Sequence, residues 1–296
     1  MILNAVVKEE QSGMRLDDAA KALFPQLSKG EIRKIIDWGG CTVSQTLVRV
    51  ASRTLREGDE ITLGVMEPER RVDLVFAKED LLYEDTECLA VNKGVGINSQ
   101  RTPYQLKGTV EYAVGEYMKS RGLKEPARVI HRLDRGTSGV MFFPKTKRAA
   151  THISALLKGG KVEKVYWTLI SGIPDEECWT TDAPIAKINK FRYGVALPGK
   201  EARTAFRLLL QGEGAALVEA RPLTGRTHQI RVHLAHGGFP IIGDTTYGGI
   251  HAPRMMLHCH SMAFRAMDGR EIKATAPPDE AFVRVCGSFG IDVNRT

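Results

Sequence analysis

The feature that most constrains the fold is a long succession of short β-type segments beginning near Leu81. They read LLYED, CLAVNKG, ARVIHRL, SGVMFFPK, KVYWTLISG, TAFRLLL and AALVEARPL. Helical patterns interrupt them at 109–121, 148–158 and 227–236. Strands therefore outnumber helices, without the regular strand–helix alternation of a doubly wound fold. We predict an α+β fold in which a large mixed or antiparallel sheet occupies residues 81–296.

A smaller unit of different character precedes this region. Apolar residues recur at helical spacing over 14–24, and Ser28 is placed to cap a second helix that Gly39 and Gly40 end. CTVSQTLV alternates like a strand, and a turn at Gly58-Asp59 leads into another.

The charged, turn-rich stretch MEPERRVDLVFAKED is expected to link the two regions. We therefore predict a small module at 12–65, a linker at 66–80 and a large domain at 81–296.

Composition limits the protein class. The 296 residues carry a net charge of +7, a moderate basic excess that suggests a polyanionic partner. No apolar run is long enough to span a membrane, and the first residues lack the pattern of a secretory signal. Five scattered cysteines, without a C-x-x-C pair, predict reduced thiols in a cytoplasmic protein.

The second predicted helix of the small module has a basic stripe. Lys29 and Arg33 lie four residues apart, and Lys34 is adjacent to Arg33. Such a stripe can contact phosphates, or it can be an ordinary solvated helix face. The residues alone leave both interpretations open.

A single acid stands among bases in VIHRLDRGTSGVMFFPK. Asp134 is flanked by Arg132 and Arg135, with His131 and Lys145 further away. Nearby cations keep a carboxylate ionised. The acid is therefore either a turn residue paired with arginine, or an ionised group kept for chemistry as nucleophile, base or metal ligand. The surrounding cations disfavour the metal.

A second polar segment spans 221–249, where Thr227 is expected to cap a helix. Arg226, His228 and Arg231 near its start suit an anion, either a phosphate or a protein carboxylate, although solvated surface arginines would give the same pattern. A histidine metal site is the other alternative, but no metal-ligand spacing supports it. The histidines concerned are His228, His233, His236, His258 and His260.

A third segment is KVEKVYWTLISG. Tyr166 alternates with Val165 and Trp167, so its side chain is expected on the opposite face of a strand from theirs. A buried core tyrosine is the alternative interpretation.

Together these segments resemble the RluA-type pseudouridine synthases. HRLDRGTSG is similar to the family signature H-R-L-D-x-x-T-S-G, KVYWTLISG to K-x-Y-x-A-L-V-x-G, and GRTHQIRVHLAHGGFPIIGDTTYG to the long third signature. Gly94 replaces the usual proline after Lys93, and Gly136 replaces a common acidic residue. Residues 14–61 resemble the αL-type RNA-binding module named after a ribosomal small-subunit protein, with CTVS where V-x-V-N is usual.

The resemblance implies roles for individual residues. Asp134 would be the nucleophile, and Arg231 its partner in a bidentate ion pair. Tyr166 would lie beside the target base, stacking on it or helping to remove the C5 proton. The uridine would leave its stack to reach Asp134, and Arg132 would hold the flipped-out arrangement. Isomerisation changes no oxidation state, so neither a cofactor nor a metal is expected.

The leading hypothesis is thus that the protein is an RNA pseudouridine synthase. It would consist of a pseudouridine synthase catalytic domain and a small αL-type RNA-binding domain. Large-subunit ribosomal RNA is the first substrate expected and tRNA the second, with no membrane partner and a monomer as default. Lys29, Arg33, Lys34, Arg132, Arg226 and His228 would contact RNA. An RNA-binding assembly factor with a decayed site and a metal hydrolase are the competing classes.

Overall fold

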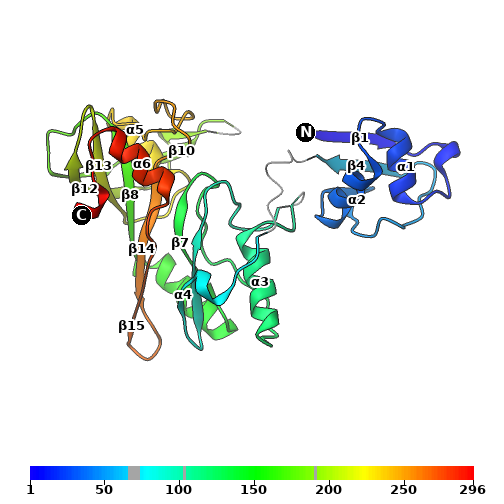
Figure 1. The fold of residues 1–296 in the computed structure, drawn as a ribbon, viewed down its shortest axis with the longest axis horizontal. Helices are drawn as coiled ribbons and strands as arrows, with labels where there is room; N and C mark the ends of the chain where they lie inside the picture. The colour runs from blue at the N-terminus through cyan, green and yellow to red at the C-terminus, as the bar shows by residue number, and fades with distance from the viewer. Residues whose placement is uncertain (66–73, 103–104, 190–191) are drawn as a thin grey trace. The chain divides into compact units, whose positions relative to one another are not determined.

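The computed structural model describes residues 1–65, 74–102, 105–189 and 192–296. The chain forms two compact units, Met1–Phe76 with Ile97–Arg121, and Ala77–Gly96 with Gly122–Thr296 (Figure 1). The first unit thus includes residues before 12 and the segment Ile97–Arg121, which the sequence-based division placed elsewhere. Residues 66–73 of the expected linker lie outside the described part.

The first unit contains an antiparallel sheet with the strand order β1-β4-β2-β3. Ser28 caps the second helix as predicted, because its Oγ accepts the Glu31 N–H at 3.1 Å. CTVSQTLV is a hairpin rather than one strand, since positive φ angles at Ser44 and Gln45 reverse the chain. The elements are β1 Ile2–Val6, α1 Leu16–Leu23, α2 Lys29–Asp37, β2 Cys41–Val43, β3 Thr46–Leu47 and β4 Glu60–Gly64, with a 3₁₀ turn at Glu9–Gln11.

A buried apolar cluster between the sheet and α1 and α2 holds this unit together, including Leu16, Ile32 and Ile61. The segment Ile97–Arg121, which carries α3 (Val110–Ser120), joins it at the end of α2. There the Leu106 N–H donates to the Trp38 carbonyl at 2.6 Å.

The second unit is built on one mixed sheet, as predicted. In the described chain nine strands run in the order β5-β6-β7-β14-β8-β13-β12-β9, with β15 paired to β14 (Figure 1). Only the β7–β14 pair is parallel. Their bounds are β5 Leu81–Glu84, β6 Cys88–Lys93, β7 Ser138–Pro144, β8 Glu163–Ser171, β9 Cys178–Asp182, β12 Arg203–Gln211, β13 Ala215–Pro222, β14 Leu257–Arg265 and β15 Glu271–Thr275.

Two details of the second unit differ from expectation. ARVIHRL forms no strand, and its His131 instead accepts the Phe142 N–H on β7 at 3.0 Å. The cap of α5 (Gln229–His236) is His228, in a left-handed conformation at φ 57°, rather than Thr227. The remaining elements are β10 Ile185–Lys187, β11 Tyr193–Val195, α4 Lys147–Lys158, α6 Glu280–Ser288 and 3₁₀ turns at Lys78–Asp80 and Val293–Arg295.

The described elements also bear on two expectations from composition. None of the helices in the described ranges is long and apolar enough to cross a membrane. All five cysteines are unpaired, and Cys178 alone among them is exposed.

Candidate active site

The second unit contains a cavity of about 630 Å³. Its lining includes the loop before β7, the end of α4, the start of β8, residues 222–231 and Leu257 on β14. Asp134 is the single acidic residue among the described residues of this lining. The cavity therefore places one carboxylate among an excess of positive charge, which comes from Arg132, Lys158, Lys164, Arg226 and Arg231.

The Asp134 side chain is available to the cavity. Its turn is closed by the backbone, since the Thr137 N–H donates to the Asp134 carbonyl at 3.0 Å. Oδ2 accepts a hydrogen bond from Arg231 Nη1 at 3.0 Å, whereas Oδ1 has no partner within the described residues. With 28% of the side chain exposed, the structure favours an accessible carboxylate over a turn anchor.

Arg231 makes its bidentate ion pair with a different acid. Its Nε and Nη2 donate to the two oxygens of Asp244 at 2.7 and 2.8 Å, which leaves Nη1 alone for Asp134. The bidentate Arg231–Asp134 pair expected from the sequence is therefore wrong. Burial opposes the charge of Arg231, but Asp244 and Asp134 together raise its pKa. The guanidinium also lies 4.9 Å from the Tyr247 ring.

A hydrogen-bond chain favours one tautomer of His228. The Tyr247 hydroxyl accepts the Tyr193 N–H at 3.0 Å, so its own proton is free to donate to His228 Nδ1, 2.9 Å away. Burial lowers the pKa of His228, more than Asp134 raises it. The neutral ring then carries its proton on Nε2, which lies 3.6 Å from Asp134 Oδ2.

Tyr166 faces the cavity, as the alternation along β8 predicted. It lines the same cavity as Asp134, while its neighbour Trp167 stacks on His260 with ring centroids 3.8 Å apart. Burial, with contributions from Cys259 and Asp134, raises the pKa of Tyr166 well above its usual value. The phenol is therefore protonated at neutral pH and can donate a hydrogen bond or stack.

The cations near Asp134 are mostly not those adjacent in sequence. Arg135 Nε donates to the Gly96 carbonyl at 2.8 Å, and Lys145 pairs with Glu84 at 2.8 Å. Burial lowers the pKa of His131 to about 4, so this ring is neutral at pH 7. Of the four bases near Asp134 in sequence, Arg132 remains as an exposed cation of the cavity wall.

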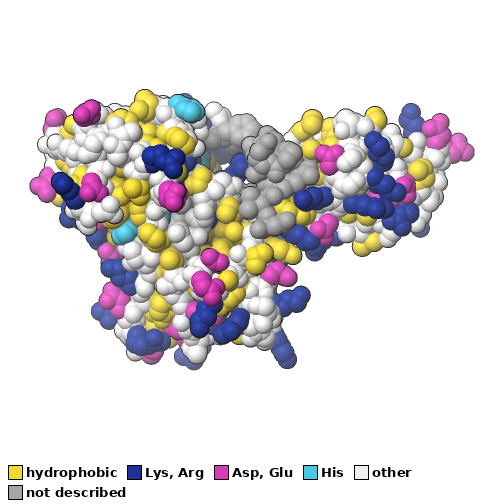
Figure 2. Space-filling view, viewed as in Figure 1, with side chains coloured by type: hydrophobic (Ala, Val, Ile, Leu, Met, Phe, Trp, Pro, Cys, Tyr) yellow, Lys and Arg dark blue, Asp and Glu magenta, His cyan; other side chains and the backbone are white. Residues whose placement is uncertain are grey.

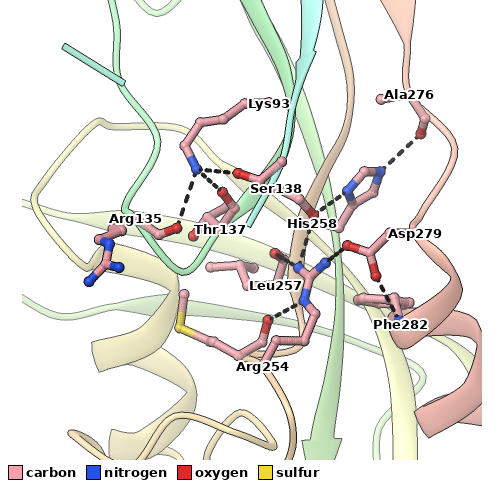
Figure 3. Close-up of polar contacts among 12 residues, drawn as sticks. Lys93, Arg135, Thr137, Ser138, Arg254, Leu257, His258, Ala276, Asp279 and Phe282 are labelled. Atoms are coloured by element: carbon pink, nitrogen blue, oxygen red, sulfur yellow. Dashed lines mark hydrogen bonds and ion pairs between the residues drawn. The ribbon is translucent and has the colours of Figure 1, made fainter. Parts of the chain in front are cut away.

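Beneath the loop lies Lys93, which the sequence analysis did not identify as a functional residue. Its side chain is fully buried at the end of β6, and Nζ donates to the carbonyls of Thr137 at 2.6 Å, Gly94 at 3.0 Å and Arg135 at 3.3 Å (Figure 3). Burial lowers the pKa of Lys93 to about 7, although Asp134 opposes this. Lys93 therefore holds the backbone that presents Asp134.

A buried network fixes the next residue of the loop. Ser138 Oγ accepts a hydrogen bond from Arg254 at 2.9 Å and lies 2.8 Å from His258 Nδ1 (Figure 3). Arg254 also pairs with Asp279, the N-cap of α6. Next to it, a Cβ on Gly139 would lie 2.1 Å from the Cys259 carbonyl oxygen, so only glycine allows β7 to approach β14 this closely.

Two of the histidines considered as metal ligands use both ring nitrogens in hydrogen bonds within the protein. The two ring nitrogens of His258 form hydrogen bonds with Ser138 and Ala276. Those of His233 form hydrogen bonds with Thr204 and Ala183. Over the ranges that the structure describes, no group of three His, Cys, Asp or Glu side chains could hold a metal ion.

The basic helix of the small module is partly neutralised. Arg33 Nε lies 2.7 Å from the buried Asp17, and Lys29 pairs with Asp18. The view in Figure 2 shows acidic side chains among the Lys and Arg side chains of this unit. Lys34 is exposed, with its ammonium 6.0 Å from the centre of the Trp38 ring. Of the three cations, Lys34 is thus the one without a carboxylate partner among the described residues.

Comparison with known proteins identifies the class of enzyme. The family model described as RNA pseudouridylate synthase matches residues 87–236. An uncharacterized RNA pseudouridine synthase of Aquifex aeolicus is 35% identical over 81% of this chain and 79% of its own length. The chain belongs to the RNA pseudouridine synthase family, isomerases that act on uridines in RNA.

Named relatives and a solved structure extend this comparison. Ribosomal large subunit pseudouridine synthase C of Vibrio cholerae is 32% identical over 82% of this chain and 79% of its own length, and synthase D of Xanthomonas campestris is 30% identical over 98% and 93%. The structure titled human RNA pseudouridylate synthase domain containing 4 shares the fold, with a TM-score of 0.62 at 24% identity over 72% of this chain and 93% of that one.

Proposed function

We propose that this enzyme converts uridine to pseudouridine in large-subunit ribosomal RNA, with Asp134 as the nucleophile. The observation that carries the proposal is Asp134, which among the described residues is the single acid in a cavity lined by five cations and has no partner for its Oδ1. The names of the Vibrio and Xanthomonas relatives support large-subunit RNA as the substrate. A polyanion is attracted to such a cavity, and an ionised carboxylate within it can react.

In the proposed reaction, the bond between uracil N1 and the ribose breaks and a bond between C5 and the ribose forms. The proton leaves C5, and N1 is protonated, so no oxidant is consumed. Asp134 would attack or stabilise the reacting sugar or base through Oδ1 while Oδ2 stays on Arg231. Asp244 holds Arg231 in place throughout.

The target uridine would have to leave its stack to reach Asp134, at a cost of a few kcal/mol. Arg132, exposed on the cavity wall, is placed to hold the extruded arrangement. Tyr166, which lines the cavity, would stack on the base rather than remove the C5 proton, because its protonated phenol is a poor proton acceptor. Arg226 and His228, which line the same cavity, would contact the RNA.

The test is chemical mapping of pseudouridine in total RNA from cells with and without this gene. We expect one or more large-subunit positions to lose the modification, and the purified chain to restore it on an unmodified transcript. Loss confined to tRNA would overturn the ribosomal assignment and keep the enzyme class. RNA binding without conversion would support an assembly factor instead.

The small module is proposed to bind RNA through Lys29, Arg33 and Lys34. Because Lys29 and Arg33 already pair with Asp18 and Asp17, phosphates would have to compete for them. Replacing all three by alanine should make RNA binding less dependent on salt, by about 0.7 in the slope of log Kd against log salt per lost contact. The double variant at the exposed Lys8 and Arg56 is the control; equal slopes in the two variants would refute the assignment.

A further inference from the structure

Lys164 is a cation of the cavity that the proposed mechanism does not use. It lies on β8 two residues before Tyr166, so both side chains are on the same face of the strand, and both line the cavity. It is half-buried, and its ammonium makes no hydrogen bond or ion pair with any residue that the structure describes. Burial lowers the pKa of Lys164, while its charge lowers that of His131.

An ammonium in this position is unfavourable for the free protein. Removing a charge from water without a counterion costs free energy, and lysines are almost never fully buried unless they are paired. Asp134 is the single acid in the lining, and its hydrogen-bonded oxygen is used by Arg231. Lys164 therefore has a charge that a bound anion could neutralise.

The wall around Lys164 extends this positive site. Lys158, the last residue of α4, is exposed, lines the cavity and also has no carboxylate partner in the described ranges. Gly160 lies between the two lysines along the lining, at a left-handed turn with φ 67°. Lys158 and Lys164 thus form a cationic patch on the α4–β8 wall, whereas Arg226 belongs to residues 222–231.

We propose that Lys164, assisted by Lys158, binds a phosphodiester group flanking the target uridine. This inference rests on the proposed function, since it assumes that the uridine reaches Asp134 with its backbone crossing the cavity. A phosphate is anionic at every relevant pH and offers the oxygen acceptors that an ammonium requires. Lys164 is thereby a substrate-positioning residue, fixing where the strand lies relative to Asp134.

The experiment compares Lys164→Met with Lys164→Arg and with Lys161→Met, in the full-length chain. Lys161 is a matched control because it is exposed and outside the cavity lining. Binding of an unmodified large-subunit RNA transcript is measured over a series of KCl concentrations. We expect Lys164→Met to weaken binding about tenfold and to lower the salt slope by about 0.7. Lys164→Arg should retain the slope, and Lys161→Met should match the wild type.

Thermal unfolding without RNA provides a second readout. If Lys164 serves a ligand, the methionine variant should unfold at a higher temperature than the wild type, because an unpartnered charge has been removed. A lower unfolding temperature with an unchanged salt slope would show a structural lysine and overturn the proposal. A loss of kcat at saturating RNA with an unchanged slope would place Lys164 on the base rather than the phosphate, which also overturns it.

The same measurements separate this inference from the proposed function. If the wild type binds the transcript but forms no pseudouridine, the proposed conversion of large-subunit RNA fails. The phosphate site is then tested only by whether Lys164→Met lowers the salt dependence of RNA binding relative to the wild type.

Discussion

Asp134 and Asp244 lie on two different loops, and both accept hydrogen bonds from Arg231. The two carboxylates differ in burial and in the number of hydrogen bonds that they accept. Asp244 is 2% exposed and accepts two hydrogen bonds from Arg231. Asp134 accepts one, is 28% exposed at its side chain, and keeps an oxygen unpaired within the described residues. The first carboxylate fixes the guanidinium, and the second is positioned by it. Two identical side chains thus have different roles because of burial and hydrogen-bond count.

The sharpest test of this difference is Asp134→Asn. The amide keeps the shape of the side chain but removes the negative charge, so we expect pseudouridine formation to fall by roughly 10³-fold or more. The free energy of unfolding should change by no more than about 1 kcal/mol, since the pair is single and partly exposed. Single-turnover conversion and chemical denaturation measure the two quantities. Conversion at the wild-type rate would remove Asp134 as the nucleophile.

The converse test is Asp244→Asn, for which stability should be the larger effect. Breaking a buried ion pair leaves Arg231 without its bidentate partner, and we expect a loss of about 3–5 kcal/mol in the free energy of unfolding. Activity should fall too, because Arg231 would then be free to pair with both oxygens of Asp134. Denaturant unfolding with enzyme assays below the transition checks this. A stable but inactive Asp244→Asn protein would reverse the assigned roles.

The sequence predicted one of these loops much better than the other. Asp134 is conspicuous in HRLDRGTSG, because it is a lone acid among bases. Asp244 follows an apolar run in GFPIIGDTTYGG and resembles an ordinary turn residue. Its role depends on a contact with Arg231 thirteen residues away, across a turn whose geometry no local pattern encodes. The mixed sheet was predictable from strand patterns, whereas the partner of Arg231 was not.

Cations were predicted less well than the acid, for a related reason. Arg135 and Lys145 are close to Asp134 in sequence but bind Gly96 and Glu84, whereas Arg231 bonds Asp134 from 97 residues away. Lys93 ends the run CLAVNK, and nothing in this sequence pattern predicts that its ammonium is buried beneath the Asp134 loop, where it donates to the Thr137 carbonyl. Sequence proximity is a poor guide to charge neighbours where a sheet brings distant strands together.

Lys93 allows the support of the Asp134 loop to be tested through pH. Its pKa is about 7 in the folded protein, below the value of about 10.4 for an unfolded lysine. Between these values the unfolded state binds more protons, so this residue makes stability rise with pH. The wild type should therefore gain stability relative to Lys93→Met as pH rises from 7 to about 10. A difference in unfolding free energy that is constant with pH would contradict the lowered pKa.

The smallest expected effect concerns Tyr247, which follows Asp244 in the same loop. Its hydroxyl bonds His228, and the His228 ring lies 3.6 Å from Asp134. Tyr247→Phe removes the hydroxyl that donates to His228 Nδ1, at a cost of about 1 kcal/mol in stability. Without that donor the neutral ring loses a hydrogen bond, so we expect the pKa of His228 to rise.

A protonated His228 would compete with substrate for Asp134, 3.6 Å away, so the acid limb of the pH–rate profile should move to higher pH. NMR titration of the His228 ring measures the same shift directly. His236→Gln is the control, because His236 lies on the same helix, is exposed and is outside the cavity lining. If Tyr247→Phe leaves the His228 titration and the rate profile unchanged, the two loops communicate through Arg231 alone.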